Sequence, residues 1–283
     1  MSIRNAHSSG SDRKQKEEHN TRLGGAACRD LRALMALVCQ SATRPWLEKH
    51  LTPMMEANGL HWCCGDGEET LQIASLLGEH CNLLGIDEDE VMIETARQKQ
   101  ALSGLERVHF AQAGLYNWSK DTPYDFIYTR MQMIAAPEPE QWLAEVLRKL
   151  KSDGILLVEI FYLPRFQMYP YNHAFARAME LIGRLEEGQP YGSKQFPDLL
   201  EKAGFINIEK AYAAPTFMPC ACNRIASLSL ECYQAEILRR GESNRAELNA
   251  LLLELRAYEQ EADSLISRPG MLQITARKNE PSK

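Results

Sequence analysis

Short apolar runs alternate with longer segments of helical periodicity through the middle of the chain. The runs expected to be β-strands are 60–64, 81–86, 108–111, 126–131 and 155–161. Between them, helices are predicted for 68–79, for a segment that ends at 103–104 and for a segment that opens at Pro139. Strands that alternate with amphipathic helices indicate a parallel sheet with right-handed crossovers. The pattern therefore predicts a doubly wound α/β domain from about residue 55 to residue 161.

The segments on either side of this region are richer in helices. Helical patterns are predicted for 26–58, with breaks at Pro45 and Pro53, and for 174–187, 197–203, 221–239 and 244–263. Two more strands are expected at 205–212 and 271–276. No linker is long enough to separate two domains, so we expect one domain over residues 26–283 behind a polar, mobile arm of residues 1–25. Its core is predicted at 55–161, 193–216 and 270–278, and a helical cap at 26–54, 162–192 and 217–266.

One predicted helix carries an apolar stripe. In 244–263 the stripe consists of Leu248, Leu251, Leu252, Leu255 and Tyr258. We expect these side chains to pack on the core, and a dimer interface is the alternative.

The charge balance narrows the classes of partner. The chain of 283 residues carries 32 Lys and Arg against 38 Asp and Glu, a formal net charge of −6. Nucleic acids and anionic membranes select a basic surface, so neither is expected as the main partner. No apolar run reaches the ~18 residues of a membrane helix, and the first residues lack the apolar stretch of a signal peptide. The sequence predicts a soluble, cytoplasmic protein that is a monomer or a homodimer.

Eight cysteines in a chain of this length are too few for a disulfide framework, so reduced thiols are expected. Cys220, Cys222 and Cys232 lie close enough in sequence to raise the question of zinc. They lack a second closely spaced pair of Cys or His residues, and no metal site is predicted.

A glycine-containing turn, CCGDG at residues 63–67, follows the first expected strand. Asp87 follows the second strand, about 20 residues after the turn. In open α/β sheets ligands lie beyond the carboxyl ends of the strands, and an acid at this spacing accepts the two hydroxyls of a ribose. The pattern is typical of a site for a cofactor that contains adenosine. The alternative is a turn whose own acids cap and stabilise the helix that follows.

Acidic residues at the start of that helix bear on the choice of cofactor. Asp66, Glu68 and Glu69 lie where a dinucleotide places its pyrophosphate, and the third glycine of G-x-G-x-x-G is missing. Carboxylates at this end of a helix repel phosphate, so NAD and FAD are disfavoured, and a nicotinamide oxidoreductase is the third choice of function. A cofactor with adenosine, a sulfonium and no phosphate suits this turn, which points to S-adenosylmethionine.

Four runs of the chain together resemble the motif series of class I S-adenosylmethionine-dependent methyltransferases. They are LHWCCGDGEETLQIASLLGE, LLGIDEDEVMIETAR, YDFIYTRM and LRKLKSDGILLVEIF. The resemblance extends to the small-molecule type with a helical cap through TRPWLEKHL, GSKQFPDLLEKAGFINIE and SLISRPGMLQITARK. It implies a Rossmann-like methyltransferase fold, that is, a doubly wound, mostly parallel seven-stranded sheet with an antiparallel last strand plus the helical cap. It also implies S-adenosyl-L-methionine as the cofactor.

The resemblance assigns roles to individual residues. The turn would cradle the methionine part of the cofactor, Asp87 would hold the ribose hydroxyls, and Arg130 would lie near the sulfonium or the substrate entrance. The residues of the turn are Cys63, Cys64, Gly65, Asp66 and Gly67. The residues implied to lie beside the adenine are Glu88, Met92, Gly114 and Leu115.

Three positions depart from the family pattern. His61 replaces the usual acid of the first strand, Cys63 replaces the first glycine of the turn, and Gly114 replaces the acid that binds the adenine amino group. Loss of that last hydrogen bond would cost about 1–3 kcal/mol. A degenerate methyltransferase-fold protein that acts as a non-catalytic binding or scaffold protein is therefore the alternative function.

The segment after the fifth expected strand holds the candidate substrate residues. They are Tyr162, Arg165, Tyr169, Tyr171 and His173. Tyrosines line aromatic pockets and histidine is the common base near neutral pH, whereas cap packing and a surface histidine are the alternatives. No residue is assigned as catalytic, and His173 and Tyr162 are the candidates. The predicted function is S-adenosylmethionine-dependent methyl transfer to a small organic molecule.

Overall fold

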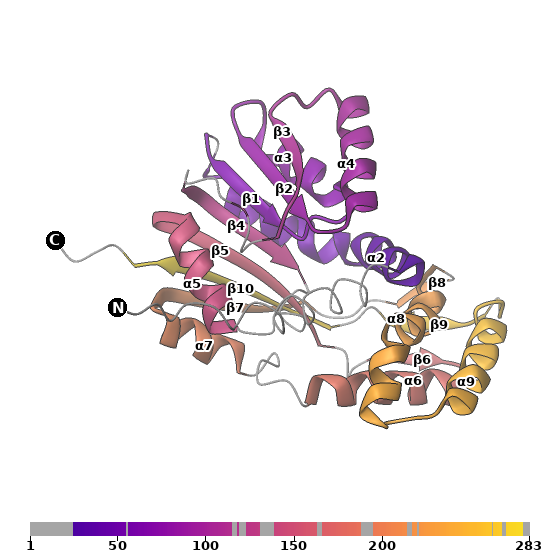
Figure 1. Ribbon diagram of the computed structural model, residues 1–283. Helices are drawn as coiled ribbons and strands as arrows, with labels where there is room; N and C mark the ends of the chain where they lie inside the picture. The colour runs from indigo at the N-terminus through magenta and orange to yellow at the C-terminus, as the bar shows by residue number, and fades with distance from the viewer. Residues whose placement is uncertain are drawn as a thin grey trace, which may run out of the picture.

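A seven-stranded sheet runs through the structure, a computed structural model (Figure 1). The residues described are 25–54, 56–114, 118, 123–130, 139–162, 166–187, 195–213, 217–219, 221–261, 263–267 and 270–279. The strands of the sheet are β1 (Asn58–Trp62), β2 (Asn82–Asp87), β3 (Val108–Gln112), β4 (Tyr124–Arg130), β5 (Leu150–Tyr162), β7 (Phe205–Ala213) and β10 (Gly270–Lys278). Their spatial order is β3-β2-β1-β4-β5-β10-β7. The order reverses between β1 and β4, which is the point where doubly wound sheets bind ligands.

The strand directions confirm the predicted sheet. β1 is parallel to β2 and β4, and the pairs β2–β3 and β4–β5 are parallel as well. β10 is antiparallel to both β5 and β7, as predicted for the closing strand. The carboxyl ends of β1, β2 and β4 therefore meet at one edge, where the predicted cofactor residues lie.

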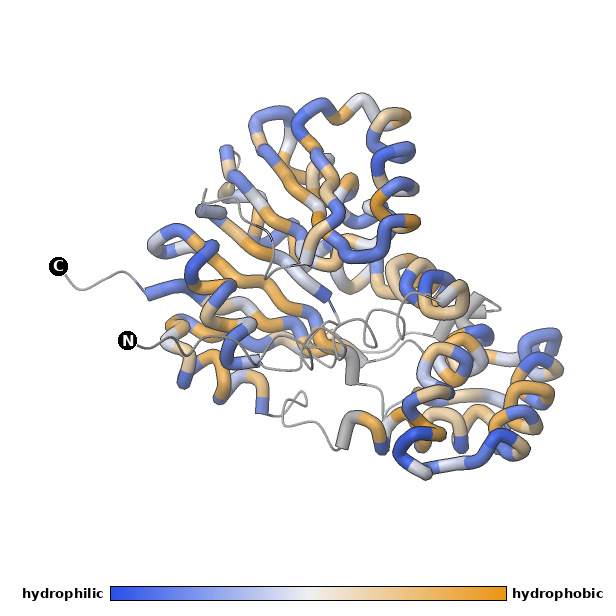
Figure 2. Tube along the Cα trace, viewed as in Figure 1, coloured by the Kyte–Doolittle hydropathy of each residue, from blue (hydrophilic) through white to orange (hydrophobic). Residues whose placement is uncertain are grey.

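Helices cover both faces of this sheet (Figure 1). α2 (Ala26–Leu51), α3 (Glu68–Leu77) and α4 (Glu90–Ser103) lie on one face, and α5 (Pro139–Lys149) and α7 (Phe196–Ala203) lie on the other. Alternate residues of β5 serve the two sides, since Leu156 and Val158 pack with α5 and α7 whereas Leu157 packs with α2 and α3. A strand covered on both faces is apolar throughout, and Figure 2 shows these strands in hydrophobic colours.

A second group of helices and a small sheet form the cap (Figure 1). Its elements are α6 (His173–Glu187), the 3-10 helix η3 (Ala221–Arg224), α8 (Ile225–Arg240), α9 (Arg245–Tyr258), β6 (Met168–Tyr169), β8 (Phe217–Pro219) and β9 (Leu265–Ser267). The N-terminal half of α2 adds Leu31, Met35 and Val38 to the core of the cap. The C-terminal half adds Trp46 and Leu47 to the core beneath the sheet. α2 is therefore the element that the cap and the sheet share.

The apolar stripe on α9 packs inside the cap, as expected. Leu248, Leu251, Leu255 and Tyr258 are buried in the cap core, and Leu252 is partly buried against it.

The helix break predicted at Pro45 is wrong. α2 runs without interruption from Ala26 to Leu51 with Pro45 inside it. Proline removes one helical N–H bond, but Thr43, Trp46 and Leu47 around it are buried. Tertiary packing of this kind supplies most of the stability of a helix in a protein and overrides the local cost.

The expectation of reduced cysteines is wrong for one pair. Cys28 in α2 and Cys232 in α8 form a disulfide across a sequence separation of 204 residues. The two helices pack together in the cap and bring the cysteines into contact, which no spacing rule reveals. Within the described ranges, Cys63, Cys64 and Cys81 are not in a disulfide.

Neither a metal cluster nor a membrane helix is found in the part of the chain that the structure describes. No three His, Cys, Asp or Glu side chains gather there in a metal-binding group. Cys220 lies outside the described residues, and so does the side chain of Cys222. Within the same ranges no helix combines the length and the apolar character needed to cross a bilayer.

Candidate functional site

The turn between β1 and α3 adopts left-handed backbone angles at three positions. Cys63, Gly65 and Gly67 have φ angles of 58°, 56° and 76°, a region open to glycine that costs other residues about 1–2 kcal/mol. Cys63 thus adopts a conformation that suits the glycine of the family pattern. A Cβ on Gly67 would lie 2.7 Å from the ring of Phe110, so glycine lets α3 begin close to β3. A Cβ on Gly65 would meet no described atom within 4 Å, so this residue lies on the open side of the turn.

The two thiols of the turn are not poised to react. Burial raises the pKa of the Cys63 and Cys64 thiols well above the usual range, and the charge of Asp87 raises both further. The thiolate is the nucleophilic form of cysteine, and both side chains stay protonated at neutral pH. Their role in the turn is packing, with Cys64 buried in the core shared with α3 and α4.

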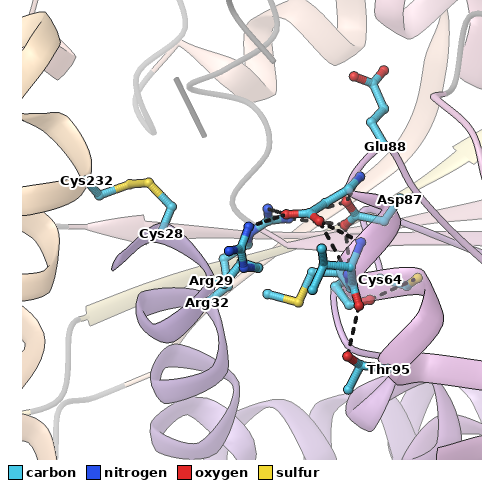
Figure 3. Close-up of polar contacts among 12 residues, drawn as sticks. Cys28, Arg29, Arg32, Cys64, Asp87, Glu88, Thr95 and Cys232 are labelled. Atoms are coloured by element: carbon cyan, nitrogen blue, oxygen red, sulfur yellow. Dashed lines mark hydrogen bonds and ion pairs between the residues drawn. A yellow bond between two sulfur atoms is a disulfide. The ribbon is translucent and has the colours of Figure 1, made fainter. Parts of the chain in front are cut away.

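Asp87 joins this turn to the end of β2 (Figure 3). Its side chain is 4% exposed. Oδ2 accepts a hydrogen bond from the Gly65 N–H at 3.0 Å, and Oδ1 accepts one from the Asp89 N–H at 3.0 Å. The structure therefore brings Asp87 into contact with the turn of residues 63–67, as the spacing in the sequence predicts. A buried carboxylate beside an open glycine turn is suited to accept hydrogen bonds from ligand hydroxyls.

Two arginines of α2, which the sequence interpretation missed, lie against the carboxylates of Asp87 and Asp89 (Figure 3). Arg32 Nη1 is 3.2 Å from Asp87 Oδ2 and 3.4 Å from Oδ1. Arg32 Nη2 and Arg29 Nη1 are each 3.6 Å from Asp89 Oδ2. Charge therefore ties the N-terminal part of α2 to the end of β2 and the start of α4. The Arg32–Asp87 contact spans 55 residues, and nothing in the sequence around either residue signals it.

The acidic residues at the start of α3 are paired within the chain. Lys99 Nζ of α4 lies 2.7 Å from Asp66 Oδ2 and 2.9 Å from Glu68 Oε2. Glu69 is buried and lies 2.6 Å from Arg130. The acids are thus offset by nearby cations, which weakens the electrostatic argument against a pyrophosphate.

Glu159 is the centre of a buried polar network near the carboxyl ends of β4 and β5. Its carboxylate, 0% exposed, accepts hydrogen bonds from the Tyr128 hydroxyl at 2.8 Å and the Gln273 amide at 2.7 Å. It also accepts one from the Thr43 hydroxyl at 2.9 Å. These donors belong to β4, β10 and α2, so one carboxylate links three elements to β5. The signal in the sequence is a lone acid within an apolar run, and Glu159 is absent from the predicted site.

Arg130, predicted to lie near the sulfonium end of the cofactor, is the cation of this network. Its Nη1 is 2.6 Å from Glu69 Oε1 and 3.8 Å from Glu159 Oε2, and its side chain is 10% exposed. Burial raises the pKa of Glu69 to about 7, with Arg130 opposing the shift and Glu159 adding to it. Burial, together with the charge of Arg130, lowers the pKa of His61 to about 3. His61 is therefore neutral, and its Nδ1 shares a hydrogen bond with the Thr70 hydroxyl at 2.8 Å.

His61 and Glu69 give the stability opposite dependences on pH. His61 binds a proton with a pKa of 6.5 when unfolded and about 3 when folded, so its contribution to the free energy of unfolding falls as the pH drops below 6.5. Glu69 binds a proton with a pKa of 4.5 when unfolded and about 7 when folded, so its contribution grows as the pH drops from 7 to 4.5. The two slopes oppose each other between pH 6.5 and 4.5. From pH 4.5 down to about 3 the loss from His61 remains, at roughly 1.4 kcal/mol per pH unit.

The substitution His61→Asn removes this loss and retains a hydrogen-bonding partner for Thr70. Between pH 6.5 and about 3, we expect the wild type to lose free energy of unfolding relative to the variant by up to roughly 1.4 kcal/mol for each pH unit. Urea unfolding at several pH values measures this difference. The matched control is His109→Asn, at an exposed position on β3, which removes a histidine outside the buried network. A level difference for His61→Asn from pH 7 to 4.5 would mean that His61 takes up its proton in the folded protein.

The other predicted cofactor residues lie near the start of α4 and the end of β3. Met92 is buried in the first turn of α4, and Glu88 is exposed just before that helix. The carbonyl of Gly114 accepts a hydrogen bond from the Trp118 N–H at 3.1 Å. Leu115 lies outside the described residues.

The predicted substrate residues lie at the end of β5 and in the cap. Tyr169 and Tyr171 are 68% and 72% exposed, and His173 is exposed at the first residue of α6. Arg165 lies outside the described residues, and so does the side chain of Tyr162. Their contacts with a substrate stay a prediction.

A hollow of about 220 Å³ lies between α2 and α3. Thr43 and Glu69 are among the residues that line it, whereas Asp87 is not. The hollow is smaller than the roughly 300–1,000 Å³ of typical cofactor pockets. We therefore place the candidate site at Asp87 and the turn, outside this hollow.

Comparison with known families and sequences shows what this chain is similar to. The model of a family described as methyltransferase domain matches residues 57–204. A demethylmenaquinone methyltransferase of Bacillus licheniformis is 25% identical over 185 residues, which are 59% of this chain and 79% of that protein. A carboxy-S-adenosyl-L-methionine synthase of Campylobacter jejuni is 29% identical over 152 residues, or 48% of this chain and 63% of that protein.

Solved structures share the fold. The YcgJ protein from Bacillus subtilis is similar with a TM-score of 0.52 and 16% identity, over 83% of this chain and 99% of that chain. At this identity the likeness concerns the arrangement of the elements alone. It agrees with the sheet order and the antiparallel β10 described above.

Proposed function

The chain belongs to the class I S-adenosylmethionine-dependent methyltransferases, since the methyltransferase-domain family matches residues 57–204, and we propose that it methylates a small organic molecule. Its cofactor is S-adenosylmethionine. The observation that carries the proposal is the buried Asp87 carboxylate beside the open face of Gly65, at the point where the strand order reverses.

We place the cofactor on the residues that surround this point. Asp87 supplies the acceptor oxygens that ribose hydroxyls need, and the open side of the turn at Gly65 lets a ligand approach the backbone. Met92, buried at the start of α4, is proposed to contact the adenine. These residues fit S-adenosylmethionine, because a carboxylate and backbone N–H groups are present and this cofactor has no phosphate that needs to be bound.

When bound, S-adenosylmethionine supplies an electrophilic methyl group for an in-line displacement. The contribution of the chain is to hold the acceptor in line and to keep water away, which accounts for much of the lowering of the barrier in such reactions. Arg130 lies at the end of β4 and is held by its ion pair with Glu69. We propose that it places an immobile, positively charged side chain near the reacting atoms. No side chain is assigned as a base, because a base is needed only when the acceptor atom must lose a proton.

Three features support a small acceptor. The cap of α6, α8 and α9 has its own hydrophobic core and lies beside the sheet (Figure 1). The net charge of −6 disfavours a polyanionic acceptor such as nucleic acid. A relative named as a demethylmenaquinone methyltransferase matches this chain over 79% of the relative's own length.

The test is a transfer assay on the purified protein, kept with a thiol reductant. Methyl-labelled S-adenosylmethionine is incubated with panels of phenols and quinols, amines and carboxylic acids, and mass spectrometry detects the labelled product and S-adenosylhomocysteine. We expect turnover in one panel that is lost in Asp87→Ala. Transfer of label to peptides or RNA, with none to the small-molecule panels, would contradict the proposed acceptor class.

A non-catalytic scaffold is the second candidate, and two observations favour it. Cys63 occupies a left-handed position of the turn, and Arg32 lies on Asp87. Calorimetric titration of the reduced protein with S-adenosylhomocysteine separates the two functions. Binding at micromolar strength, about −8 kcal/mol, supports the enzyme. The absence of a heat of binding at millimolar ligand would support the scaffold function.

A further inference from the structure

Three buried side chains near the end of β4 form a cluster whose charges do not balance. Arg130 Nη1 lies 2.6 Å from Glu69 Oε1 and 3.8 Å from Glu159 Oε2. One guanidinium therefore faces two carboxylates, and with both acids ionised the cluster carries a net charge of −1. An uncompensated charge is costly away from water. The cluster is thus suited to hold one proton.

Glu69 is the member of the cluster that binds this proton. The Glu159 carboxylate accepts hydrogen bonds from donors of α2, β4 and β10, which suits its ionised form. Burial raises the pKa of Glu69 to about 7, with Arg130 opposing the shift and Glu159 adding to it. Glu69 therefore changes its protonation near neutral pH, where a nearby charge of either sign shifts the balance.

Other titratable groups surround the cluster, and those nearest to Glu69 are neutral. Burial keeps His61 unprotonated, with Nε2 3.7 Å from Glu69 Oε2. Burial also raises the pKa of the Tyr128 hydroxyl well above its usual range. The remaining groups on the helices that pack here are Cys39 of α2, which acts on the charge of Arg130, the pair Arg44–Glu48 of α2, and Lys99 of α4 paired with Asp66 and Glu68.

The hollow between α2 and α3 gives Glu69 a route to water. Its volume of about 220 Å³ holds several water molecules. Its polar lining residues are Gln40, Thr43, Arg44, Glu69, Gln72 and Ser75. Arg44 and Ser75 are exposed, so the hollow reaches the surface. A proton on Glu69 can therefore leave on this side, away from the carboxyl ends of the strands.

The opposite side of the cluster faces the proposed cofactor site. Asp87 lies at the end of β2, and β1 separates β2 from β4 in the sheet, a span of about 10 Å. In S-adenosylmethionine a single carbon joins the sulfonium to the ribose. With the ribose on Asp87 and the methionine part along the turn, the sulfonium comes over β1 towards Arg130 and Glu69. The positive charge of the cofactor thus lies near a cluster that becomes negative when it loses its proton.

We propose that Glu69 is the counter-charge of the sulfonium and gives up its proton when S-adenosylmethionine binds; the inference rests on the function proposed above. With the proton the cluster is neutral, and without it the charge of −1 balances the sulfonium. The proton passes to water through the hollow. S-adenosylhomocysteine has no sulfonium, so after methyl transfer Glu69 takes a proton back. Glu69 thereby distinguishes the methyl donor from its product.

The experiment counts the protons that the full-length protein releases when it binds each ligand. Calorimetric titrations with S-adenosylmethionine and with S-adenosylhomocysteine are run in two buffers of different ionisation enthalpy, and the difference in observed heat gives the number of protons. At pH 6.5 we expect S-adenosylmethionine to release up to about three quarters of a proton more than S-adenosylhomocysteine. At pH 8 this excess should fall to about a tenth of a proton, because Glu69 is then already ionised.

Glu69→Gln tests whether this residue is the source of the proton. Glutamine keeps the shape of the protonated acid and cannot ionise, so the excess release at pH 6.5 should disappear. The preference for S-adenosylmethionine over S-adenosylhomocysteine should also fall about tenfold, since an opposite charge at this range shifts a pKa by about one unit or more. Glu68→Gln is the matched control, because its side chain is 51% exposed and pairs with Lys99. It should keep both the excess release and the preference, and circular dichroism verifies the fold of each variant.

The outcomes separate this inference from the proposed function. Equal proton release by the two ligands in the wild type at pH 6.5 would overturn the role of Glu69, and this measurement needs no variant. An excess release that persists in Glu69→Gln would overturn it as well. If neither ligand binds the wild type at millimolar concentration, the cofactor site itself is overturned.

Discussion

Replacing Asp87 with alanine should weaken the binding of S-adenosylhomocysteine to the reduced protein by about 100-fold or more. Each hydrogen bond to a charged group contributes about 1.5–3 kcal/mol, and two ribose hydroxyls lose their acceptor together. The carboxylate also accepts the Gly65 N–H at 3.0 Å, so the turn loses its tie to β2 in the same substitution. Calorimetric titration with S-adenosylhomocysteine measures the affinity. An affinity within a factor of about three of the wild type would remove Asp87 from the ribose site.

The control for this substitution is another carboxylate of the same sheet. Asp125 Oδ2 accepts a hydrogen bond from the Asn58 N–H at 2.8 Å and pairs with Lys151 at 2.7 Å. It lies near the start of β4, at the opposite end of the strands from Asp87. Asp125→Ala therefore removes a comparable backbone anchor and should leave the affinity unchanged. Asp87→Asn keeps one acceptor oxygen and should fall between the alanine variant and the wild type.

The fold could be predicted from the sequence because its determinants are local. Apolar runs of strand length alternate with helical stripes, and these patterns place β1 to β5 within a few residues of their true ends. The helix α2 shows the limit of this reasoning. Proline has a strong local penalty, and only the packing around Pro45, on the sheet and the cap, reveals why the helix continues.

Some residues of the candidate site could likewise be predicted from the sequence, and others could not. The turn at Gly67 and the residue Asp87 could be related from their spacing along the chain, because they lie at the carboxyl ends of consecutive parallel strands. Arg32, Glu159 and the partner of Cys28 could not, since each has a contact with a residue more than 50 positions away in sequence. Their side chains carry no local signal, and their neighbours become known only when the helices and strands are placed.

Replacing Glu159 with alanine should lower the free energy of unfolding by about 3–5 kcal/mol, the usual loss when one partner of a buried charged network is removed. The carboxylate is 0% exposed and accepts hydrogen bonds from Thr43, Tyr128 and Gln273. Without it, these donors stay buried with no acceptor at that place. Arg130 also loses a negative charge 3.8 Å away. A domain is stable by only about 5–15 kcal/mol, so the substitution removes a large share of the total.

Urea unfolding followed by circular dichroism measures this loss, and two variants define its origin. Glu48→Ala breaks an exposed pair between Arg44 and Glu48 on α2 and should cost no more than about 1 kcal/mol. Glu159→Gln keeps the shape and one acceptor oxygen, so its loss should be smaller than that of the alanine variant. A loss below about 1 kcal/mol in Glu159→Ala would mean that water reaches the network and replaces the carboxylate. The loss of stability should be largest for Glu159→Ala, smaller for Glu159→Gln and smallest for Glu48→Ala. This order requires that one buried carboxylate links α2, β4 and β10 to β5. The same carboxylate then fixes the end of β4, where Arg130 lies.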